Sequence, residues 1–353
     1  MLVPGFSGSI LVKPARPYRK ILNKTLVNNR WLQLNSKQWN LDNGASFKPE
    51  GSGHGLVLHG DLVPHHVGGL DGIRNICRDL HWFSSMFDMI DLTDRLDEHF
   101  NFTYFDSLIN ALESDGAVPT ADLFGFPYDF RFVLDPEVKR QTFANLRFVI
   151  ETAVRKNKGA VVMVCHSQGA LVVKWFLNEM PLDWTRHHVH KFVAINAPFS
   201  GVPHVLHILK NGDHYIKPMR KWLLENLRFN TGLVMMMPPI EESELIRCDL
   251  EGVARLRREL YEPQRERIEA PLQVPSIVIH SELYRETVAQ IEFNDDGDCI
   301  ETIGMGDGVV PNHSILAYEQ SLPMTEALLT MNASHGLILQ HPDFIDAIRS
   351  IRV

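Results

Sequence analysis

Hydrophobic positions along the middle of the chain form helical stripes and short continuous runs, which predict helices and strands in alternation. Asp135 and Pro136 mark a helix start, because an N-cap aspartate before a first-turn proline is a common helix beginning. The apolar residues that follow recur at helical spacing and predict a helix packed on a sheet: Phe143, Leu146, Ile150 and Val154. Four apolar residues over 161–164 then predict a buried strand, and 170–180 predict a further helix.

Short apolar runs elsewhere extend this alternation over most of the chain. Residues 1–12 read as a short strand that opens into a glycine-rich loop. Further strands are predicted at 191–195 and 275–280, a helix at 102–114, and a helix-like run at 337–351. The repeated β–α–β order predicts an α/β fold, with a mostly parallel sheet and helices on both faces.

A serine stands at the sharpest of these corners. Cys165-His166-Ser167-Gln168-Gly169 joins the predicted strand to the predicted helix. A serine on such a turn is the nucleophile elbow of an α/β-hydrolase, which exposes Oγ beside the free N–H groups of a helix start. Gly169 supplies the small residue that this close approach needs, whereas Cys165 stands where the usual motif has glycine. An ordinary strand-to-helix turn is the structural alternative for this segment taken alone.

Two further residues complete the chemistry in the order serine, acid, histidine, which α/β-hydrolases use. Asp307 lies among glycines in the segment 304–311, where a tight loop can turn a carboxylate toward an imidazole. His335 directly precedes the helix-like run. Other histidines fit the role of base less well: His313 follows the aspartate too closely and is expected on a loop surface, and His341 lies inside the terminal run.

Two segments have a superficial metal-binding composition. His187, His188 and His190 cluster, but their neighbours supply no set of carboxylates or thiolates for zinc. The acidic segment 294–298 lacks a glutamate at the spacing of a calcium-binding EF-hand, so a solvated turn is predicted there. The sequence therefore implies neither a metal nor a cofactor.

Three further blocks occur in a recognisable order. Residues 126–131, Phe-Pro-Tyr-Asp-Phe-Arg, are similar to a Pro-Tyr-Asp-Trp-Arg block, and 196–202 are similar to Gly-Ala-Pro-Trp-Gly-Gly. Residues 306–310 are similar to Gly-Asp-Gly-Thr-Val. With the elbow and the histidine, the ordered set resembles the lecithin:cholesterol acyltransferase family, which includes lysosomal phospholipase A2 and phospholipid:diacylglycerol acyltransferases. The tyrosine, aspartate and arginine of the first block are expected to form a structural network under the site.

The resemblance implies a serine-dependent hydrolase or acyltransferase that acts on acyl esters of glycerophospholipids. It implies that Ser167, Asp307 and His335 are catalytic, and that the backbone N–H groups of Phe6 and Gln168 form the oxyanion hole. Phe6 is placed by the family position that follows Pro-Gly. The implied partners are a phospholipid, a lipid-alcohol acceptor and a membrane or lipid surface. A soluble carboxylesterase acting on small esters and a non-catalytic lipid-binding protein are the alternatives.

The length favours one α/β-hydrolase domain over 1–353 that carries two long insertions. The first insertion spans 13–80 and contains Trp31 and Trp39. In the family this excursion contacts lipid, which implies that the tryptophans contact substrate or membrane. Packing of the tryptophans on the hydrolase core is the alternative.

The second insertion, 202–272, is expected to form a cap or lid. It contains Met235, Met236 and Met237 on a predicted loop. Methionine side chains adapt to varied apolar partners. They are therefore expected either to contact substrate or membrane from a lid, or to fill the core of a cap domain.

Composition restricts partners and location. Apolar residues make up 44% and charged residues 22% of the chain, as in soluble globular proteins. A net charge of −8 argues against nucleic acid as a partner. No apolar run reaches the roughly 18 residues of a membrane-spanning helix, and no signal peptide is visible. The expected location is the cytoplasm or the membrane periphery, or a secreted or lysosomal one if the natural chain begins upstream.

The cysteines are few and scattered. They are Cys77, Cys165, Cys248 and Cys299. Cys165 is expected to be a buried free thiol because it lies inside the elbow, and pairing of Cys248 with Cys299 stays open. This usage favours a reducing compartment.

Overall fold

The structure, a computed structural model, describes most of the chain. The described residues are 1–6, 9, 11–12, 63–64, 70, 104–211, 230–281 and 283–351. Nearly all of the first expected insertion, with Trp31, Trp39 and Cys77, lies outside these residues.

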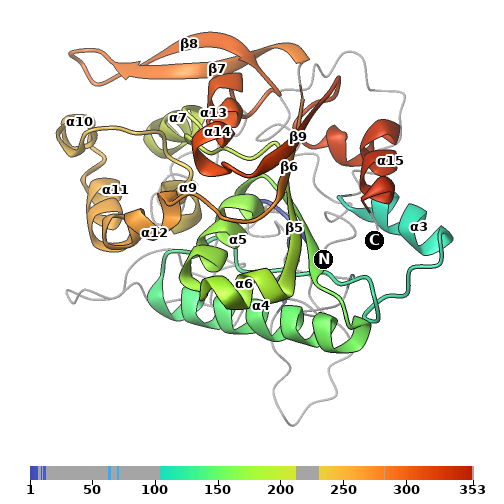
Figure 1. The fold of residues 1–353 in the computed structure, drawn as a ribbon. Coiled ribbons are helices and arrows are strands. Elements are labelled where there is room, and N and C mark those ends of the chain that lie inside the picture. Colours follow the sequence, from blue (N-terminus) through green and yellow to red (C-terminus); the bar gives the residue numbers. More distant parts are fainter. Residues whose placement is uncertain are drawn as a thin grey trace.

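A five-stranded parallel sheet forms the centre of the molecule (Figure 1). Its strands, in spatial order, are β1 (Leu2–Val3), β4 (Val161–His166), β5 (Val189–Ile195), β6 (Ser276–Ser281) and β9 (Thr325–Met331). The strands predicted at the start of the chain and around the serine are therefore confirmed. The short strand β1 pairs Leu2 with Val164 and Val3 with Cys165.

Side chains along the strands alternate between two apolar clusters, one on each face of the sheet. The covering helices are α3 (Asp106–Ser114) and α15 (Pro342–Ser350) for one cluster, and α4 (Pro136–Asn157) and α5 (Gln168–Glu179) for the other. In β4, Val164 belongs to the first cluster and Cys165 to the second. Burial on both faces is typical of parallel sheets and confirms the predicted α/β architecture.

The helix before β4 begins as predicted. The Asp135 carboxylate accepts hydrogen bonds from the backbone N–H groups of Glu137, at 3.0 Å, and Val138, at 3.2 Å. These bonds satisfy donors that have no partner within the helix. The helical apolar stripe is buried at Phe143 and Leu146, as the spacing indicates. A short helix, α6 (Leu182–His188), connects α5 to β5.

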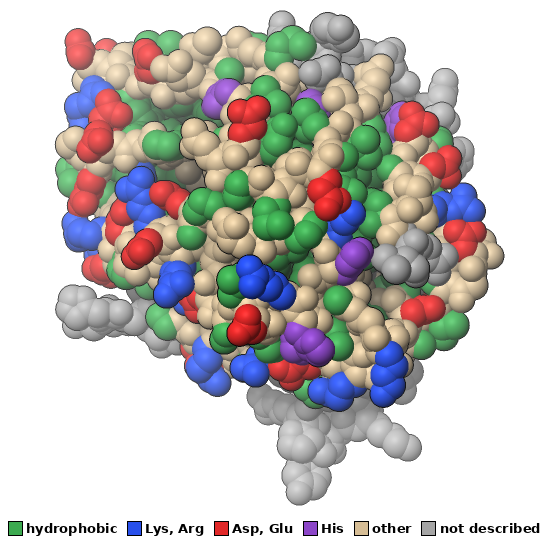
Figure 2. Space-filling model, viewed as in Figure 1, with side chains coloured by type: hydrophobic (Ala, Val, Ile, Leu, Met, Phe, Trp, Pro, Cys, Tyr) green, Lys and Arg blue, Asp and Glu red, His purple; other side chains and the backbone are tan. Residues whose placement is uncertain are grey.

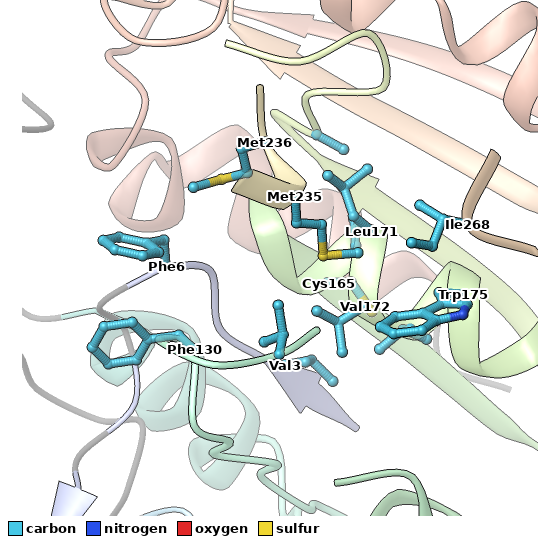
Figure 3. Close-up of a cluster of buried hydrophobic side chains, with 14 of the residues drawn as sticks. Val3, Phe6, Phe130, Cys165, Leu171, Val172, Trp175, Met235, Met236 and Ile268 are labelled. Carbon is cyan, nitrogen blue, oxygen red and sulfur yellow. The ribbon is translucent and has the colours of Figure 1, made fainter. Parts of the chain in front are cut away.

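The described part of 202–272 is mostly helical. Its elements are α7 (His204–Asn211), α9 (Thr231–Met235), α10 (Glu242–Arg247), α11 (Glu251–Leu256), η3 (Arg257–Tyr261), η4 (Glu262–Gln264) and α12 (Arg265–Glu269). The predicted methionine loop is wrong for Met235, which ends α9. Met235, Met236 and Met237 are 4%, 3% and 8% exposed, which favours cap-core packing over an exposed lid surface. Figure 3 shows Met235 close to Leu171 inside the buried cluster.

A long antiparallel hairpin projects beyond the central sheet and was not predicted (Figure 1). It consists of β7 (Leu283–Phe293) and β8 (Cys299–Gly306). The acidic segment 294–298 is its turn, closed by a bond of 3.1 Å from the Asn294 N–H to the Asp298 carbonyl, so the solvated-turn prediction is confirmed. A second small pair joins β2 (Leu11–Val12) to β3 (Val63–Pro64).

Short helices complete the fold after β8. They are α13 (Asn312–Leu316), α14 (Tyr318–Ser321) and η5 (Leu337–Gln340), followed by α15. The single helix predicted over 337–351 is broken, because Pro342 lacks a backbone N–H and begins a new helix. His313 is exposed as expected, but it lies on α13 and not on a loop.

No helix within the described ranges is long and apolar enough to span a membrane. The cysteines that the structure describes, Cys165, Cys248 and Cys299, are all free, so the pairing left open is not formed. On the face shown in Figure 2, acidic and basic side chains are interspersed. Strand β8 carries exposed apolar side chains at Ile300 and Ile303.

Candidate active site

The corner between β4 and α5 has an unusual backbone. Ser167 adopts φ 53° and ψ −130°, a conformation that non-glycine residues rarely adopt. Its N–H donates to the Ile195 carbonyl at 2.8 Å, and its carbonyl accepts from Ala170 at 3.0 Å. A strained serine on a strand-to-helix turn matches the geometry of a nucleophile elbow.

The loop after β1 packs directly against this corner. A Cβ atom placed on Gly169 would lie 2.2 Å from the Pro4 carbonyl oxygen, so only glycine allows the two backbones to approach. A Cβ on Gly5 would lie 2.7 Å from the Ser167 Cβ. Cys165 is fully buried in the core cluster, where its small side chain fits in place of the usual glycine (Figure 3).

The structure brings together the three residues expected to be catalytic. His335 Nε2 lies 3.0 Å from Ser167 Oγ, and His335 Nδ1 lies 2.6 Å from Asp307 Oδ2. The carboxylate can only accept, so Nδ1 carries the hydrogen of that bond, and Nε2 faces the serine hydroxyl. Exposed fractions of 5%, 0% and 3% for Ser167, Asp307 and His335 keep these contacts away from bulk water.

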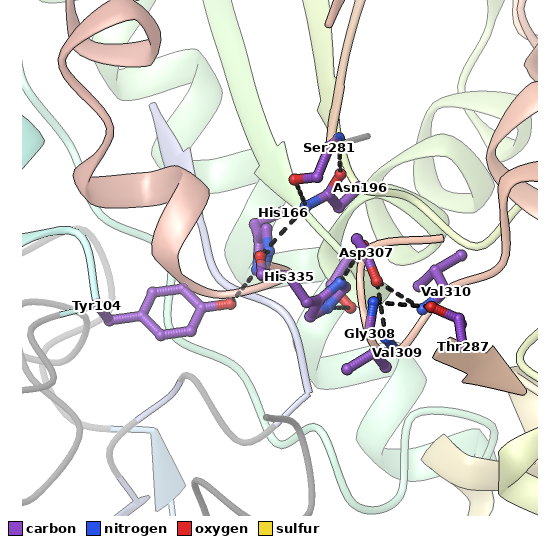
Figure 4. Close-up of polar contacts among 11 residues, drawn as sticks. Tyr104, His166, Asn196, Ser281, Thr287, Asp307, Gly308, Val309, Val310 and His335 are labelled. Atoms are coloured by element: carbon purple, nitrogen blue, oxygen red, sulfur yellow. Dashed lines mark hydrogen bonds and ion pairs between the residues drawn. The ribbon is translucent and has the colours of Figure 1, made fainter. Parts of the chain in front are cut away.

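The aspartate is itself fixed by the loop that follows β8. Its Oδ1 accepts from the backbone N–H groups of Val309, at 2.8 Å, and Val310, at 2.7 Å. The Asp307 carbonyl accepts from the His335 N–H at 2.9 Å, which ties acid and base through their main chains as well. Figure 4 shows these contacts converging on Asp307. Bonds of this kind stabilise a carboxylate in a fixed orientation.

Of the two residues expected to form the oxyanion hole, Gln168 directly follows the serine and Phe6 lies in the loop whose Gly5 approaches the serine. Gln168 is the first residue of α5, so its N–H lies among the helix donors that have no partner within the helix. Phe6 follows Gly5 and buries its ring edge-to-face against Phe130, with centroids 4.9 Å apart. The Gln168 side chain accepts from the Tyr128 hydroxyl at 2.9 Å and donates to a backbone carbonyl in α9 at 3.0 Å.

The expected network under the site is confirmed. Arg131 donates to Asp129 through Nε at 2.9 Å and through Nη2 at 2.8 Å, a bidentate arrangement. Both side chains are buried. Tyr128, in the same segment, makes a separate hydrogen bond to the side chain of Gln168, the residue that follows the serine. The segment 126–131 therefore makes buried structural contacts next to the serine elbow, as the sequence predicted.

Sequence reasoning missed a second set of buried polar contacts. The Gly5 N–H donates to the Tyr104 hydroxyl at 2.8 Å, and that hydroxyl is hydrogen-bonded to His166 Nδ1. His166 Nε2 lies 2.9 Å from the His335 carbonyl oxygen, which also accepts from Asn196 Nδ2 at 3.2 Å (Figure 4). Burial, with a smaller effect of the neighbouring His335, lowers the pKa of His166 well below its ordinary value. The one available sequence signal was the histidine inside the elbow motif.

The other histidines considered in the sequence lie on other elements of the described structure. His341 caps α15 by accepting from the Asp343 N–H at 3.3 Å. His187 and His188 end α6. Among the described residues, no group of three or more histidine, cysteine, aspartate or glutamate side chains is arranged to hold a metal ion.

A parallel sheet covered on both faces and a serine elbow facing a histidine–aspartate pair define the class of α/β-hydrolases. A model of the lecithin:cholesterol acyltransferase family matches residues 85–335. The chain belongs to this family, which confirms the resemblance.

Comparisons with individual proteins agree. The chain is 35% identical over 112 residues to "Lysosomal phospholipase A and acyltransferase" of Bos taurus, covering 32% of this chain and 27% of that protein. It is 28% identical over 137 residues to "Phosphatidylcholine-sterol acyltransferase" of Gallus gallus, covering 38% and 33%. The chain thus matches about a quarter to a third of the length of these relatives. A crystal structure of the "Tle4-Tli4 complex" shares the fold, with a TM-score of 0.54, 11% identity, and coverage of 98% and 96%.

Proposed function

We propose that this chain is a serine-dependent acyltransferase and phospholipase that acts on glycerophospholipids through an acyl-Ser167 intermediate. The carrying observation is the continuous set of hydrogen bonds from Ser167 through His335 to Asp307 in a member of this family. The names of two relatives, a lysosomal phospholipase A and acyltransferase and a phosphatidylcholine-sterol acyltransferase, support lipid esters as substrates, and the first supports a lysosomal location.

The first half of the reaction forms the acyl-enzyme. His335 Nε2 removes the proton as Ser167 Oγ attacks the ester carbonyl, and Asp307 stabilises the imidazolium that results. The N–H groups of Gln168 and Phe6 are proposed to hold the tetrahedral oxyanion, each contributing roughly 3 kcal/mol to the lowering of the barrier. His335 then returns its proton to the departing lyso-lipid oxygen.

The second half decides between two activities. Water attacking the acyl-serine gives a fatty acid, whereas a lipid alcohol gives a new ester, and both use the same base and oxyanion donors. The acceptor that reaches the acyl-serine, a lipid alcohol or water, therefore decides which activity results, and we propose both for this chain.

The two insertions are proposed to bring the site to lipid. Residues 13–80, with Trp31 and Trp39, are proposed as the membrane-contacting excursion, and 202–272 as a cap over the acyl groove. The burial of Met235 and its neighbours supports a packed cap, and Figure 3 shows Met236 on the side of Phe6.

The test uses the purified chain with phosphatidylcholine vesicles that carry labelled acyl chains, with and without a lipid alcohol. We expect labelled fatty acid from vesicles alone and labelled ester when the alcohol is present. Ser167→Ala should abolish both products, and Ser350→Ala, at the exposed end of α15, should change neither.

Two results would contradict the proposal in different ways. Cleavage of short soluble esters without any reaction on vesicles would favour the small-ester carboxylesterase. Failure of a fluorophosphonate to label Ser167 would favour a non-catalytic lipid-binding protein, because an activated serine reacts with such a probe.

A further inference from the structure

We propose that Tyr104 and His166 are positioning residues that join the oxyanion loop, the nucleophile elbow and the loop of the base by one directed chain of hydrogen bonds. This inference rests on the proposed function, since it concerns how the same serine and histidine are held. Neither residue touches the reacting atoms. Both are buried, with exposed fractions of 4% and 2%.

The donor-to-acceptor direction of these hydrogen bonds follows from the two groups at their ends. The His335 carbonyl can only accept, so His166 Nε2 carries the hydrogen of that 2.9 Å bond. A neutral His166 then has an acceptor at Nδ1, which takes the Tyr104 hydroxyl hydrogen. The Tyr104 oxygen in turn accepts the Gly5 N–H at 2.8 Å. Each donor in the chain therefore has one acceptor, and a single arrangement satisfies all of them.

This series of hydrogen bonds connects three parts of the site that are distant in sequence. Gly5 precedes Phe6, whose N–H is a proposed oxyanion donor. His166 precedes the serine, and its partner carbonyl belongs to the proposed base, His335. Asn196, at the end of β5, donates to the same carbonyl at 3.2 Å, so two donors fix the backbone that carries the base (Figure 4). Movement of that backbone would change the 3.0 Å distance to Ser167 Oγ.

The charge state of His166 matters because its ring lies beside that of His335, with centroids 4.8 Å apart. The groups facing it are Tyr104 from the segment before α3, His335 from the loop after β9, and the neutral amide of Asn196. Burial also raises the pKa of Tyr104 well above its ordinary value, so its hydroxyl stays a donor. A protonated His166 would lose its bond from Tyr104 and repel the imidazolium that forms on His335.

The experiment follows phosphonylation of Ser167 by a soluble fluorophosphonate. In this reaction the Oγ–P bond forms, the P–F bond breaks, fluoride leaves and His335 takes the serine proton. Tyr104→Phe keeps the ring and removes the hydroxyl. We expect about a 10-fold lower labelling rate, since small misplacements of reacting groups have effects of this size. With a short soluble ester, the loss should appear in kcat and not in KM.

The pH profile separates positioning from a general loss of structure. Tyr104→Phe removes a hydrogen bond that favours the neutral His166 ring, so the acid limb of the labelling rate should move to higher pH in this variant. His166→Gln cannot titrate and keeps a donor for the His335 carbonyl. It should keep the wild-type acid limb. The double variant Tyr104→Phe/His166→Gln should also have the wild-type limb, because it has no residue 166 that titrates. Tyr318→Phe, on α14, serves as the matched control with an unchanged rate and profile.

The outcomes are distinct. Absence of labelling in the wild-type chain overturns both the proposed function and this inference. Labelling of the wild type, with an unchanged rate and acid limb in Tyr104→Phe, overturns this inference alone. Thermal unfolding of each variant is measured alongside. If Tyr104→Phe does not fold, the test passes to His166→Leu, which removes both hydrogen bonds of the ring. A labelling rate about 10-fold lower, with the wild-type acid limb, supports the inference, and an unchanged rate overturns it.

Discussion

Ser167 is held in a conformation that a peptide chain avoids. Backbone conformations of this kind cost about 1–3 kcal/mol each, and Ser167 has φ 53° with ψ −130°. Neighbouring contacts, including its bond to the Ile195 carbonyl at 2.8 Å, hold the residue there. The orientation of one hydroxyl is therefore maintained at the expense of stability, as is common at functional sites.

Ser167→Gly should be more stable than Ser167→Ala, by about 1 kcal/mol, because glycine adopts positive φ without strain. Urea unfolding of the two variants measures the difference. Ser350, in the last turn of α15, provides the control, because there glycine should be less stable than alanine by up to about 1 kcal/mol. Equal stabilities of the two Ser167 variants would show that the elbow carries no strain.

Gly169→Ala should lower both stability and activity. The added Cβ would meet the Pro4 carbonyl oxygen at 2.2 Å, so the β1 loop and its proposed oxyanion donor must move away. A loss of at least about 2 kcal/mol is expected for such overpacking. Gly252→Ala is the matched control, because a Cβ there meets nothing within 4 Å and helix α11 gains up to about 1 kcal/mol. Thermal melts and fluorophosphonate labelling report the two effects.

The three proposed catalytic residues could be found from sequence because each lies in a local motif of small residues. Tyr104 and His166 could not be paired in this way, since their contact spans 62 positions and the bond to the His335 carbonyl spans 169. Local patterns do not specify contacts of this separation. The imperfect motif at Cys165 is explained by its complete burial on one face of β4.

At the scale of elements, the segment before α4 connects the elbow to the cap. The Arg131 carbonyl accepts from the Gly232 N–H in α9 at 3.0 Å, while its guanidinium holds Asp129. The Gln168 side chain donates to the Gly232 carbonyl at 3.0 Å. Helix α9 is thus tied both to the buried ion pair and to the residue that follows the serine.

Arg131→Met should destabilise the protein by about 3–5 kcal/mol, because it leaves the Asp129 carboxylate buried without its partner. The matched control is Arg140→Met on α4. The ion pair of Arg140 with Glu137 is exposed, so this variant should keep the wild-type unfolding midpoint. Denaturant unfolding of both variants tests this. Similar midpoints for the two would contradict a structural role of the buried pair.

The sequence predicted best the helices and strands that bury at least one whole face in the apolar core. Strands β4 and β5 and helix α4 have continuous apolar runs or helical stripes, because the sheet is covered on both sides. The hairpin of β7 and β8 lies outside this core, and β8 exposes both charged and apolar side chains, so no face of it is marked by hydrophobicity. Pro342 indicated a break between η5 and α15, but the continuous apolar run favoured the prediction of a single helix.

At the scale of the whole molecule, stability is linked to pH through His166. Its pKa is lowered in the folded protein, so between that value and the ordinary value of about 6.5 the unfolded chain binds more protons. The stability is fully present above pH 6.5 and is lost as the pH falls. Within this window the free energy of unfolding should fall by up to about 1.4 kcal/mol per pH unit from this residue.

Urea unfolding of the wild type and of His166→Gln at pH 7.5 and pH 5 measures this contribution. The variant should lose less stability than the wild type on acidification, because glutamine binds no proton in either state. Histidines that do not contact His166 should contribute equally to both proteins and cancel in the comparison. Parallel pH dependences would mean that His166 does not carry the linkage.

The distances along the chain between the members of the site have a consequence for synthesis. Ser167 and His335 are separated by 168 positions, and Gly5 and Tyr104 by 99. Contacts between distant segments form late, because closing long loops is entropically costly. A nascent polypeptide halted on the ribosome before His335 holds a serine without a base. Under the proposed mechanism such a polypeptide is inactive, and activity begins only once translation has passed His335 and the segments from Gly5 to His335 have folded together.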